Sequence, residues 1–276
     1  MQTARRPERA SSSTNVAANS WVGFSSGMET VTCLHGFSQH GNSWRELAAL
    51  VPGSYRWLTP DVRAATLPEA EAELLALWER EGVQRGHVIG YSQGGRIALW
   101  AASDHPERLL SLITIGAHAG FDSDDRARRR EEDAALADRI EGEGIDWFAT
   151  HWAALPIFAG LARRGPDFLR QLDAARRQND PARLAAQLRG MGAGAVEPFW
   201  DRLIRVSVPT LLLVGADDER YLAFANRLRS VIRDSAVVVI PGAGHAAHLE
   251  RPAAVAAVLA THLAASPLAH DREAQG

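Results

Sequence analysis

A glycine-flanked serine between an apolar run and a helix-forming run constrains this chain more than any other feature. Residues 87–90 predict a buried strand, residues 97–102 predict a helix, and Gly90-x-Ser92-x-Gly94 lies between them. A strand that turns sharply into a helix strains its apex residue, and the two glycines remove side chains that would clash there. The pattern predicts Ser92 as a nucleophile with a helix N-terminus behind it, where N–H groups stabilise negative charge. The alternative is a surface turn of glycine and serine.

Composition places the chain among ordinary globular proteins. Its 276 residues suffice for one large α/β domain or two small ones. A net charge of −3 argues against a nucleic-acid-binding surface. The one cysteine, Cys33, excludes an intramolecular disulfide and lies in an apolar run, which predicts a buried, inert thiol. No apolar run is long enough to form a transmembrane helix, so no membrane partner is expected.

The first residues bear on targeting. Arg5-Arg6 is not followed by the apolar stretch of a signal peptide, so a cytoplasmic protein is expected. Frequent arginine and serine residues make a transit peptide the alternative. Residues 1–28 show no periodicity and are expected to be mostly disordered, with one short strand at 21–24.

Apolar strand-like runs alternate with helical segments on either side of the middle of the chain. The predicted strands cover residues 31–34, 55–59, 87–90, 109–115, 211–215 and 236–240. The predicted helices cover residues 42–50, 68–81, 93–103, 220–232 and 252–264, with Asn42 or Ser43 as the cap of the first. Continuous apolar strands are typical of a parallel sheet that is buried on both faces. The fold class is therefore α/β, with a mostly parallel sheet flanked by helices.

Residues 121–200 break this alternation because they contain no strand-like run. Helices are predicted at 125–141, 146–153, 167–178 and 181–191, with aromatic residues interleaved with arginines. An all-helical insertion after the strand that ends near Ile115 predicts a cap over the carboxyl ends of the strands, where ligands bind in open α/β sheets. The predicted domains are an α/β core of residues 29–120 and 201–266, the cap of residues 121–200, and a frayed tail of residues 267–276.

The candidate for the acid of a catalytic triad follows a predicted strand. Asp218 stands three residues after Gly215, and the order Ser92, Asp218, His245 is that of an α/β triad. A buried carboxylate there would hold the imidazole tautomer and stabilise the imidazolium. Asp217 is the alternative acid, and either carboxylate could instead be a solvated turn residue.

The candidate base lies in a glycine-rich loop after the last predicted strand. Gly244 directly before His245 gives a tight loop, so His245 is preferred to His248 as the group that takes the serine proton. No metal site is predicted, because His35 and His40 are not joined by further ligands at metal spacing.

A second motif follows the first predicted strand. The run 31–34 leads into His35-Gly36-Phe37, and the backbone N–H of a residue just after such a glycine can point into the site. Together with the N–H of Gln93, the N–H of Phe37 would form an oxyanion hole. The alternative is an ordinary strand–loop turn.

Arg96 lies one helical turn beyond Ser92 and should face the same pocket or its floor. Burying a guanidinium without an anion is costly, and its planar fork suits a carboxylate. The alternative is a salt bridge to a neighbouring acid. In the run 126–130 most arginines must be solvated, so only one is expected to enter the pocket. His118 is expected to be structural or to line the pocket wall.

Residues 30–265 resemble the α/β-hydrolase superfamily, and within it the MenH family of 2-succinyl-6-hydroxy-2,4-cyclohexadiene-1-carboxylate synthases. The resemblance rests on His35-Gly36-Phe37, Gly90-Tyr91-Ser92-Gln93-Gly94-Gly95-Arg96, His118-Ala119-Gly120-Phe121, Arg126-Ala127-Arg128-Arg129 with Asp133, Trp152-x-x-x-Pro156-x-Phe158, Arg176-x-x-Asn179-Asp180-Pro181 and Gly242-Ala243-Gly244-His245-x-x-His248.

The resemblance implies an activity and a set of binding residues. The family eliminates pyruvate from a cyclohexene precursor that carries several carboxylates, so the expected partner is a small polycarboxylate, without a cofactor or metal. By the resemblance, Arg96, Arg129 and Arg176 bind the substrate, and Tyr91 and Trp152 line its pocket. The oligomeric state is left open.

The mechanism implied by the resemblance uses the triad as a base. His245, held by Asp218, deprotonates Ser92, whose oxyanion abstracts a substrate α-proton. The amides of Phe37 and Gln93 stabilise the enolate, and elimination releases pyruvate without an acyl-enzyme.

Two other functions remain open from the sequence. The same triad suits a serine hydrolase that acts on esters or on C–C bonds, although a hydrolase of neutral esters has no use for pocket arginines. A non-catalytic receptor with this fold would carry a broken triad, whereas every member is present here.

Overall fold

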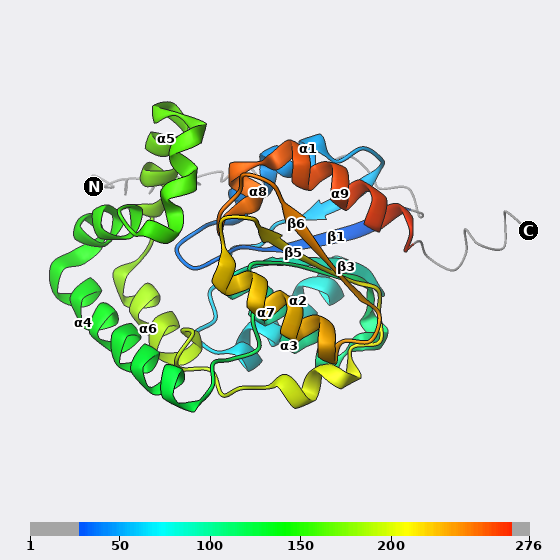
Figure 1. The fold of residues 1–276 in the computed structure, drawn as a ribbon, viewed down its shortest axis with the longest axis horizontal. Coiled ribbons are helices and arrows are strands. Elements are labelled where there is room, and N and C mark those ends of the chain that lie inside the picture. The colour runs from blue at the N-terminus through cyan, green and yellow to red at the C-terminus, as the bar shows by residue number, and fades with distance from the viewer. Residues whose placement is uncertain (1–27, 267–276) are drawn as a thin grey trace, which may run out of the picture.

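The computed structural model describes residues 28–266, which form a parallel sheet with helices on both faces (Figure 1). The predictions for the two ends of the chain, the strand at 21–24 included, lie outside these residues. The strands lie in the order β2-β1-β3-β4-β5-β6, and every neighbouring pair is parallel. All six predicted strands are confirmed, with small shifts at their ends: β1 Glu29–Leu34, β2 Tyr55–Leu58, β3 Gly86–Tyr91, β4 Leu109–Ile115, β5 Thr210–Gly215 and β6 Ser235–Ile240.

The central strands divide their side chains between two apolar cores. Val88 of β3 and Leu112 of β4 face one core, and the next residues, Ile89 and Ile113, face the other. Successive strand residues point to opposite faces, so a strand that is covered on both faces must be apolar throughout. This requirement explains why these strands were recognisable as continuous apolar runs.

Helices cover both faces of the sheet, as the alternation predicted (Figure 1). One face is covered by α2 (Leu67–Arg80), α3 (Gln93–Asp104) and α7 (Glu219–Val231). The other is covered by α1 (Arg45–Leu50) and α9 (Pro252–Ala264). Short helical turns complete the connections: η1 Gly41–Trp44, η2 Pro106–Arg108, η4 Trp200–Arg205 and α8 Ala247–Glu250.

The start of the first helical segment differs from the prediction that Asn42 or Ser43 caps it. The segment begins as the 3₁₀ turn η1, and its N-cap residue, His40, makes no capping side-chain bond. Instead, the N–H of Gly41 donates to the carboxylate of Asp61 at 2.7 Å. A residue from a neighbouring loop thus satisfies an amide at the start of this helical segment, which local capping rules do not anticipate.

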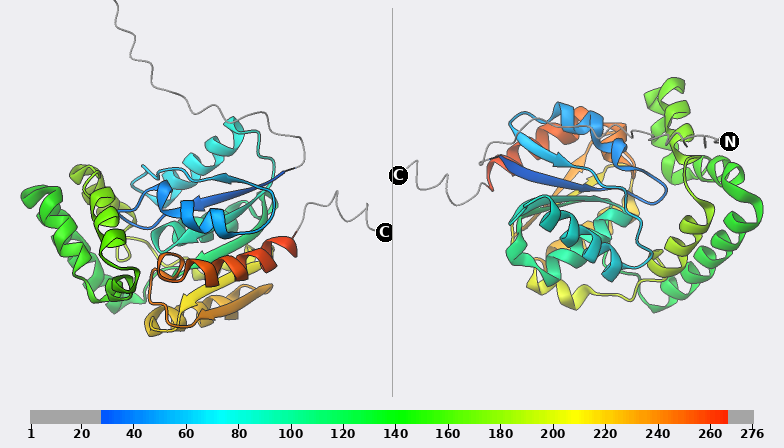
Figure 2. Two further views of the ribbon diagram at one scale, coloured as in Figure 1. Left: turned by 90° about the horizontal axis from the view of Figure 1, so that it is seen from above. Right: turned by 180° about the vertical axis from the view of Figure 1, so that it is seen from behind.

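The helical insertion lies beside the core as a separate group (Figure 2). It contains α4 (Ser123–Ala153), η3 (Pro156–Arg164), α5 (Pro166–Arg176) and α6 (Pro181–Met191), and we call residues 121–200 the cap. The cap has a small apolar core of its own, made by Ala137, Ile140, Phe148, Leu184, Ala185 and Leu188.

Two details of the cap differ from expectation. The helices predicted at 125–141 and 146–153 form the single element α4, with a break at Gly144, where φ is +82°. Glycine reaches this left-handed conformation without the strain that other residues incur. The turn η3, Pro156–Arg164, was not predicted at all.

No helix in the described part of the chain is both long and apolar enough to cross a membrane. The thiol of Cys33 is buried in the second core, and burial raises its pKa above the usual range, which agrees with the prediction of an inert thiol.

Candidate active site

Ser92 lies at a sharp turn between β3 and α3. Its backbone has φ +50° and ψ −108°, a strained conformation for a residue with a side chain. A Cβ on Gly90 would lie 2.3 Å from the carbonyl oxygen of Gly94, and a Cβ on Gly94 would lie 2.1 Å from that of Leu34. Both glycines are therefore required by close backbone contacts, as the motif predicted.

Ser92, His245 and Asp218 form one hydrogen-bonded chain. His245 Nε2 lies 3.1 Å from Ser92 Oγ, and His245 Nδ1 lies 2.8 Å from Asp218 Oδ2. A serine, an imidazole and a buried carboxylate in this order can deliver an activated oxygen nucleophile or base.

Asp217 and His248, the alternative acid and base, take no part in these hydrogen bonds. Asp217 is half exposed and forms an ion pair with Arg163, 3.0 Å away. His248 is buried, is stacked on Trp44 with 4.6 Å between ring centroids, and neither of its nitrogens has a hydrogen-bond partner within residues 28–266. Neither residue therefore contacts the serine–histidine pair through a hydrogen bond.

Phe37 and Gln93, the two predicted oxyanion-hole residues, line the same cavity as Ser92. Gln93 is the first residue of α3, so its amide has no intrahelical acceptor. The Phe37 ring packs edge-on against Phe148 and Trp152 of the cap. Cap and core thus meet directly at one of the candidate oxyanion donors.

Between the triad and the cap lies the cavity that Ser92 and His245 line, which we call the main cavity because it contains these two groups. Its volume is about 160 Å³. Aromatic and apolar side chains form much of its wall. It also carries four ionisable side chains besides His245 and Tyr221, and these are Arg96, Arg129, Asp133 and Arg220.

Arg96 is buried and, within residues 28–266, forms no ion pair, so the predicted alternative of a salt bridge is wrong. Its Nη2 donates to the carbonyl oxygen of Met191 at 2.8 Å, and its Nε has no partner in the described part of the chain. Burial lowers the pKa of this guanidinium. A cation held in this way retains N–H groups that an anion in the cavity could accept.

His118 lies against Arg96 and leaves it short of an acceptor. The N–H of Gly120 donates to His118 Nδ1 at 3.0 Å, so a neutral ring carries its proton on Nε2. Burial and the neighbouring Arg96 guanidinium hold the pKa of His118 well below its usual value. Nε2 lies 3.5 Å from Arg96 Nη1, and two N–H groups face each other there. The expectation that His118 is structural fits this position.

Arg129 is the member of the run 126–130 that lines the cavity, as predicted for a single arginine. It is already paired: its Nε lies 2.9 Å from Asp133 Oδ1, although without hydrogen-bond alignment. Asp133 is buried, accepts the N–H of Gly194 at 3.0 Å, and burial raises the pKa of its carboxyl. Arg129 is one-third exposed, so its guanidinium keeps access to the cavity.

Arg176 ends α5 and lies outside the main cavity. It borders a smaller cavity of about 30 Å³ that also contacts Ser92, Tyr91 and Trp152. Its Nε is buried without a hydrogen-bond partner among the described residues, and burial lowers the pKa of the guanidinium. Burial likewise raises the pKa of Tyr91 well above its usual value. Trp152 borders both cavities, so the two lie side by side.

Arg220 lines the main cavity and was not predicted. It is the second residue of α7, two positions after Asp218, and its guanidinium lies 4.6 Å from the centre of the Phe121 ring. The available signal was its position, because a residue at the start of the helix after the acid must lie near the carboxyl ends of the strands.

Glu250 is a second unpredicted residue, and it holds the loop of the base. Its Oε2 accepts the N–H of Gly244 at 2.8 Å, and its Oε1 accepts the N–H of Ala246 at 3.2 Å. These amides flank His245. The carboxylate is buried, and Arg163 of the cap lies 3.6 Å from it. Nothing in the local sequence marks this carboxylate, because its hydrogen-bond donors are backbone amides.

Residues 28–266 contain no group of three or more side chains that could hold a metal ion. The groups at the cavity that can take part in a reaction are the serine, the imidazole and the surrounding cations. They can attack a carbonyl carbon, or they can remove a proton next to a carbonyl whose negative charge the amides then stabilise.

Fold and site together define the class of α/β enzymes that carry a serine at a strand–helix turn. The sequence profile described as alpha/beta hydrolase fold matches residues 29–252, and the chain belongs to this family.

The resemblance to the MenH family is confirmed by similar proteins. A 2-succinyl-6-hydroxy-2,4-cyclohexadiene-1-carboxylate synthase from Enterobacter sp. (strain 638) is 33% identical, over 85% of this chain and 91% of that protein. A protein of the same name from Escherichia coli O1:K1 / APEC is 32% identical, over 85% of this chain and 93% of that protein.

Solved structures show the same fold. MenH from S. aureus has a TM-score of 0.82 at 24% identity, covering 86% of this chain and 94% of that chain. A thermophilic esterase from Thermogutta terrifontis, with malate bound, has a TM-score of 0.77 at 25% identity, covering 88% and 92%.

Proposed function

We propose that this protein is a lyase of menaquinone synthesis. It converts 2-succinyl-5-enolpyruvyl-6-hydroxy-3-cyclohexene-1-carboxylate to 2-succinyl-6-hydroxy-2,4-cyclohexadiene-1-carboxylate and pyruvate. The observation that carries this proposal is the cavity itself, which is lined by both the serine and a buried Arg96 without a carboxylate partner. The similarity to synthases of this name, at 32–33% identity over most of the chain, supports it. We place the reaction in the cytoplasm.

The reaction consumes no water and requires one proton to move. His245 Nε2 accepts the proton of Ser92, and the serine oxyanion removes the α-proton beside the succinyl carbonyl. Charge moves onto the carbonyl oxygen, where the amides of Phe37 and Gln93 stabilise it. Collapse of this enolate forms a double bond between ring carbons 2 and 3, moves the ring double bond to carbons 4 and 5, and breaks the bond from carbon 5 to oxygen. The departing enolate of pyruvate takes the proton held by His245 at its carbon and becomes pyruvate, which restores the neutral imidazole.

The distribution of cations supports a substrate with several carboxylates. Arg96, Arg129 and Arg220 line the main cavity, and Arg176 borders the smaller one beside Ser92. We assign carboxylate binding to these positions, because a planar guanidinium can donate two parallel hydrogen bonds to a carboxylate.

The test is an assay of the purified protein for pyruvate release from this substrate, followed through NADH oxidation by lactate dehydrogenase. We expect turnover by the native protein and none by Ser92→Ala. Release of pyruvate at the uncatalysed rate by the native protein would contradict the proposal.

A serine hydrolase is the second candidate, because the hydrogen-bonded triad alone also suits ester hydrolysis. The similarity to an esterase with malate bound favours this alternative for acidic esters. Turnover of p-nitrophenyl esters without any pyruvate release would establish it. A fluorophosphonate probe that labels the native protein but not Ser92→Ala would exclude a non-catalytic receptor.

A further inference from the structure

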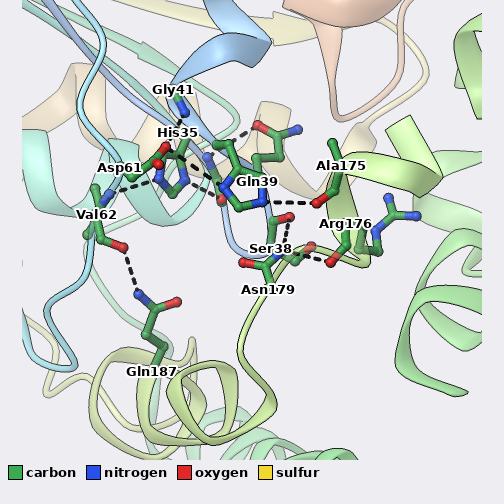
Figure 3. Close-up of polar contacts among 12 residues, drawn as sticks. His35, Ser38, Gln39, Gly41, Asp61, Val62, Ala175, Arg176, Asn179 and Gln187 are labelled. Carbon is green, nitrogen blue, oxygen red and sulfur yellow. Dashed lines mark hydrogen bonds and ion pairs between the residues drawn. The ribbon is translucent and has the colours of Figure 1, made fainter. Parts of the chain in front are cut away.

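The loop that carries Phe37 is held between the core and the cap (Figure 3). On the core side, His35 Nε2 accepts the N–H of Val62 at 2.9 Å. On the cap side, the amide nitrogen of Asn179 donates to the carbonyl oxygen of Ser38 at 3.0 Å. We call residues 35–41 the oxyanion loop.

Ser38 is the strained point of this loop. Its φ is +61°, and among non-glycine residues of the described chain only Ser38 and Ser92 have a positive φ. A side-chain-bearing residue holds such a conformation only where its surroundings impose it. Ser38 directly follows Phe37, so relaxation at Ser38 would turn the backbone that presents the Phe37 N–H.

Asn179 also holds the end of α5. The same amide nitrogen donates to the carbonyl oxygen of Arg176 at 2.9 Å, and its backbone N–H donates to that oxygen at 3.2 Å. The Asn179 side chain therefore connects Arg176, which borders the smaller cavity, with the loop that carries the candidate oxyanion donor.

We propose that Asn179 is a positioning residue, which fixes the Phe37 N–H by holding the strained backbone of Ser38 against the cap. The proposal rests on the oxyanion role assigned to Phe37 under the proposed function. It does not depend on the identity of the substrate, because any reaction that places negative charge at this point uses the same amide.

The cap offers a matched control. Gln187 of α6 donates from its amide nitrogen to the carbonyl oxygens of Val62 at 3.1 Å and Ala64 at 3.2 Å. It is likewise a cap amide that bridges two carbonyl groups, but it does not contact Ser38. Its link to the oxyanion loop runs only through Val62, whose N–H, and not its carbonyl group, bonds His35 (Figure 3).

The experiment measures the rate at which a fluorophosphonate labels Ser92, since the phosphoryl oxygen gains negative charge in the transition state of phosphonylation and then lies in the oxyanion hole. We expect Asn179→Ala to slow labelling by about tenfold or more, below the full loss of a donor because the amide is displaced and not removed. Gln187→Ala should label at the native rate. Native labelling by Asn179→Ala, or equal slowing by both variants, would overturn the proposal.

A second pair of variants separates positioning from general destabilisation. In a Ser38→Gly background, Asn179→Ala should slow labelling much less, because glycine adopts φ +61° without strain. An undiminished effect in that background contradicts the proposal. If Asn179→Ala does not fold, the comparison is repeated with Asn179→Gln and Gln187→Asn, which each change the side-chain length by one methylene. Equal labelling rates for these two variants would overturn the proposal. Lyase activity enters neither comparison, so failure of the proposed reaction and failure of this inference are distinguishable.

Discussion

Arg96 donates a hydrogen bond to the carbonyl oxygen of Met191, 2.8 Å away, and thereby joins the helix behind Ser92 to the last residue of α6. The bond orients a buried guanidinium without neutralising it. The remaining N–H groups are therefore directed by the fold before any substrate arrives, which reduces the cost of ordering them on binding.

Replacement of Arg96 by alanine should therefore impair the lyase reaction. We expect kcat/KM for pyruvate release to fall by about 100-fold or more, because hydrogen bonds to charged groups contribute about 1.5–3 kcal/mol each. Arg96→Lys should recover little, since an ammonium cannot form the paired contact. The control is Arg130→Ala, which removes the same charge from an exposed position on α4. An Arg96→Ala enzyme as active as the Arg130→Ala enzyme would refute the assigned role.

Loss of the Glu250 carboxylate should affect both stability and turnover. In Glu250→Gln, one of the two amides that flank His245 faces an NH₂ group in place of an oxygen acceptor. We expect a loss of about 1–3 kcal/mol in the free energy of unfolding, the cost of an unsatisfied buried group, and a lower kcat with little change in KM. Urea titration and steady-state kinetics test this, with the exposed Glu131→Gln as the control. Unchanged kcat in Glu250→Gln would show that the loop needs no such support.

Two glycine-to-alanine variants should behave in opposite ways. A Cβ on Gly94 would lie 2.1 Å from the carbonyl oxygen of Leu34, so Gly94→Ala must displace α3 and with it Ser92. We expect activity to be lost and stability to fall by about 1–3 kcal/mol, as in other overpacked sites. Gly142 is in α4 with no atom near its would-be Cβ, so Gly142→Ala should gain up to about 1 kcal/mol. Thermal melting and fluorophosphonate labelling compare the two, and an active Gly94→Ala protein would argue against the required turn.

The buried His248 should make the protein less stable in acid. Burial lowers its pKa from 6.5 to about 3 in the folded protein, so between these values only the unfolded chain binds the proton. The part of the free energy of unfolding that depends on a neutral His248 is complete above pH 6.5. It falls by about 1.4 kcal/mol for each pH unit below that value. Burial lowers the pKa of His118 too, so the same trend applies there.

His248→Phe isolates this contribution. Phenylalanine can stack on Trp44 as the imidazole does, and it removes two nitrogens that have no partner in residues 28–266. The free energy of unfolding, measured by urea titration between about pH 6 and pH 4, should depend on pH less steeply in the variant by about 1.4 kcal/mol per unit. Equal slopes in the two proteins would mean that His248 titrates normally.

The strands, the core helices and the turn at Ser92 were predictable because each depends on local chemistry. A strand buried on both faces must be apolar along its length, and an amphipathic helix repeats its apolar residues with the helical period. Gly90 of the serine turn is demanded by atoms of Gly94 and Gly95, a few residues away, whereas the atoms that demand Gly94 belong to Leu34 and His35. The order of serine, aspartate and histidine could be read in the same way, because each follows a predicted strand.

Two of the residues that sequence reasoning missed act through contacts with backbone groups. Glu250 accepts two amide protons, and Asn179 donates to the carbonyl oxygen of Ser38, 141 positions away. Backbone amides and carbonyls occur at almost every residue, so such contacts leave no pattern of residue types. Arg220 was missed for a related reason, because many arginines of this chain are paired on the surface and only position distinguishes those in the cavity.

Residue order alone was enough to establish the α/β class, the strained serine turn and the family, since these depend on short-range spacing that any folded form of the chain must satisfy. The tertiary structure decided that Asp218, and not Asp217, contacts His245, and that Arg96 bonds the carbonyl oxygen of Met191 in the cap while its Nε keeps no partner within residues 28–266. These features depend on which groups from distant parts of the chain meet in space, and no local pattern records such three-dimensional distances.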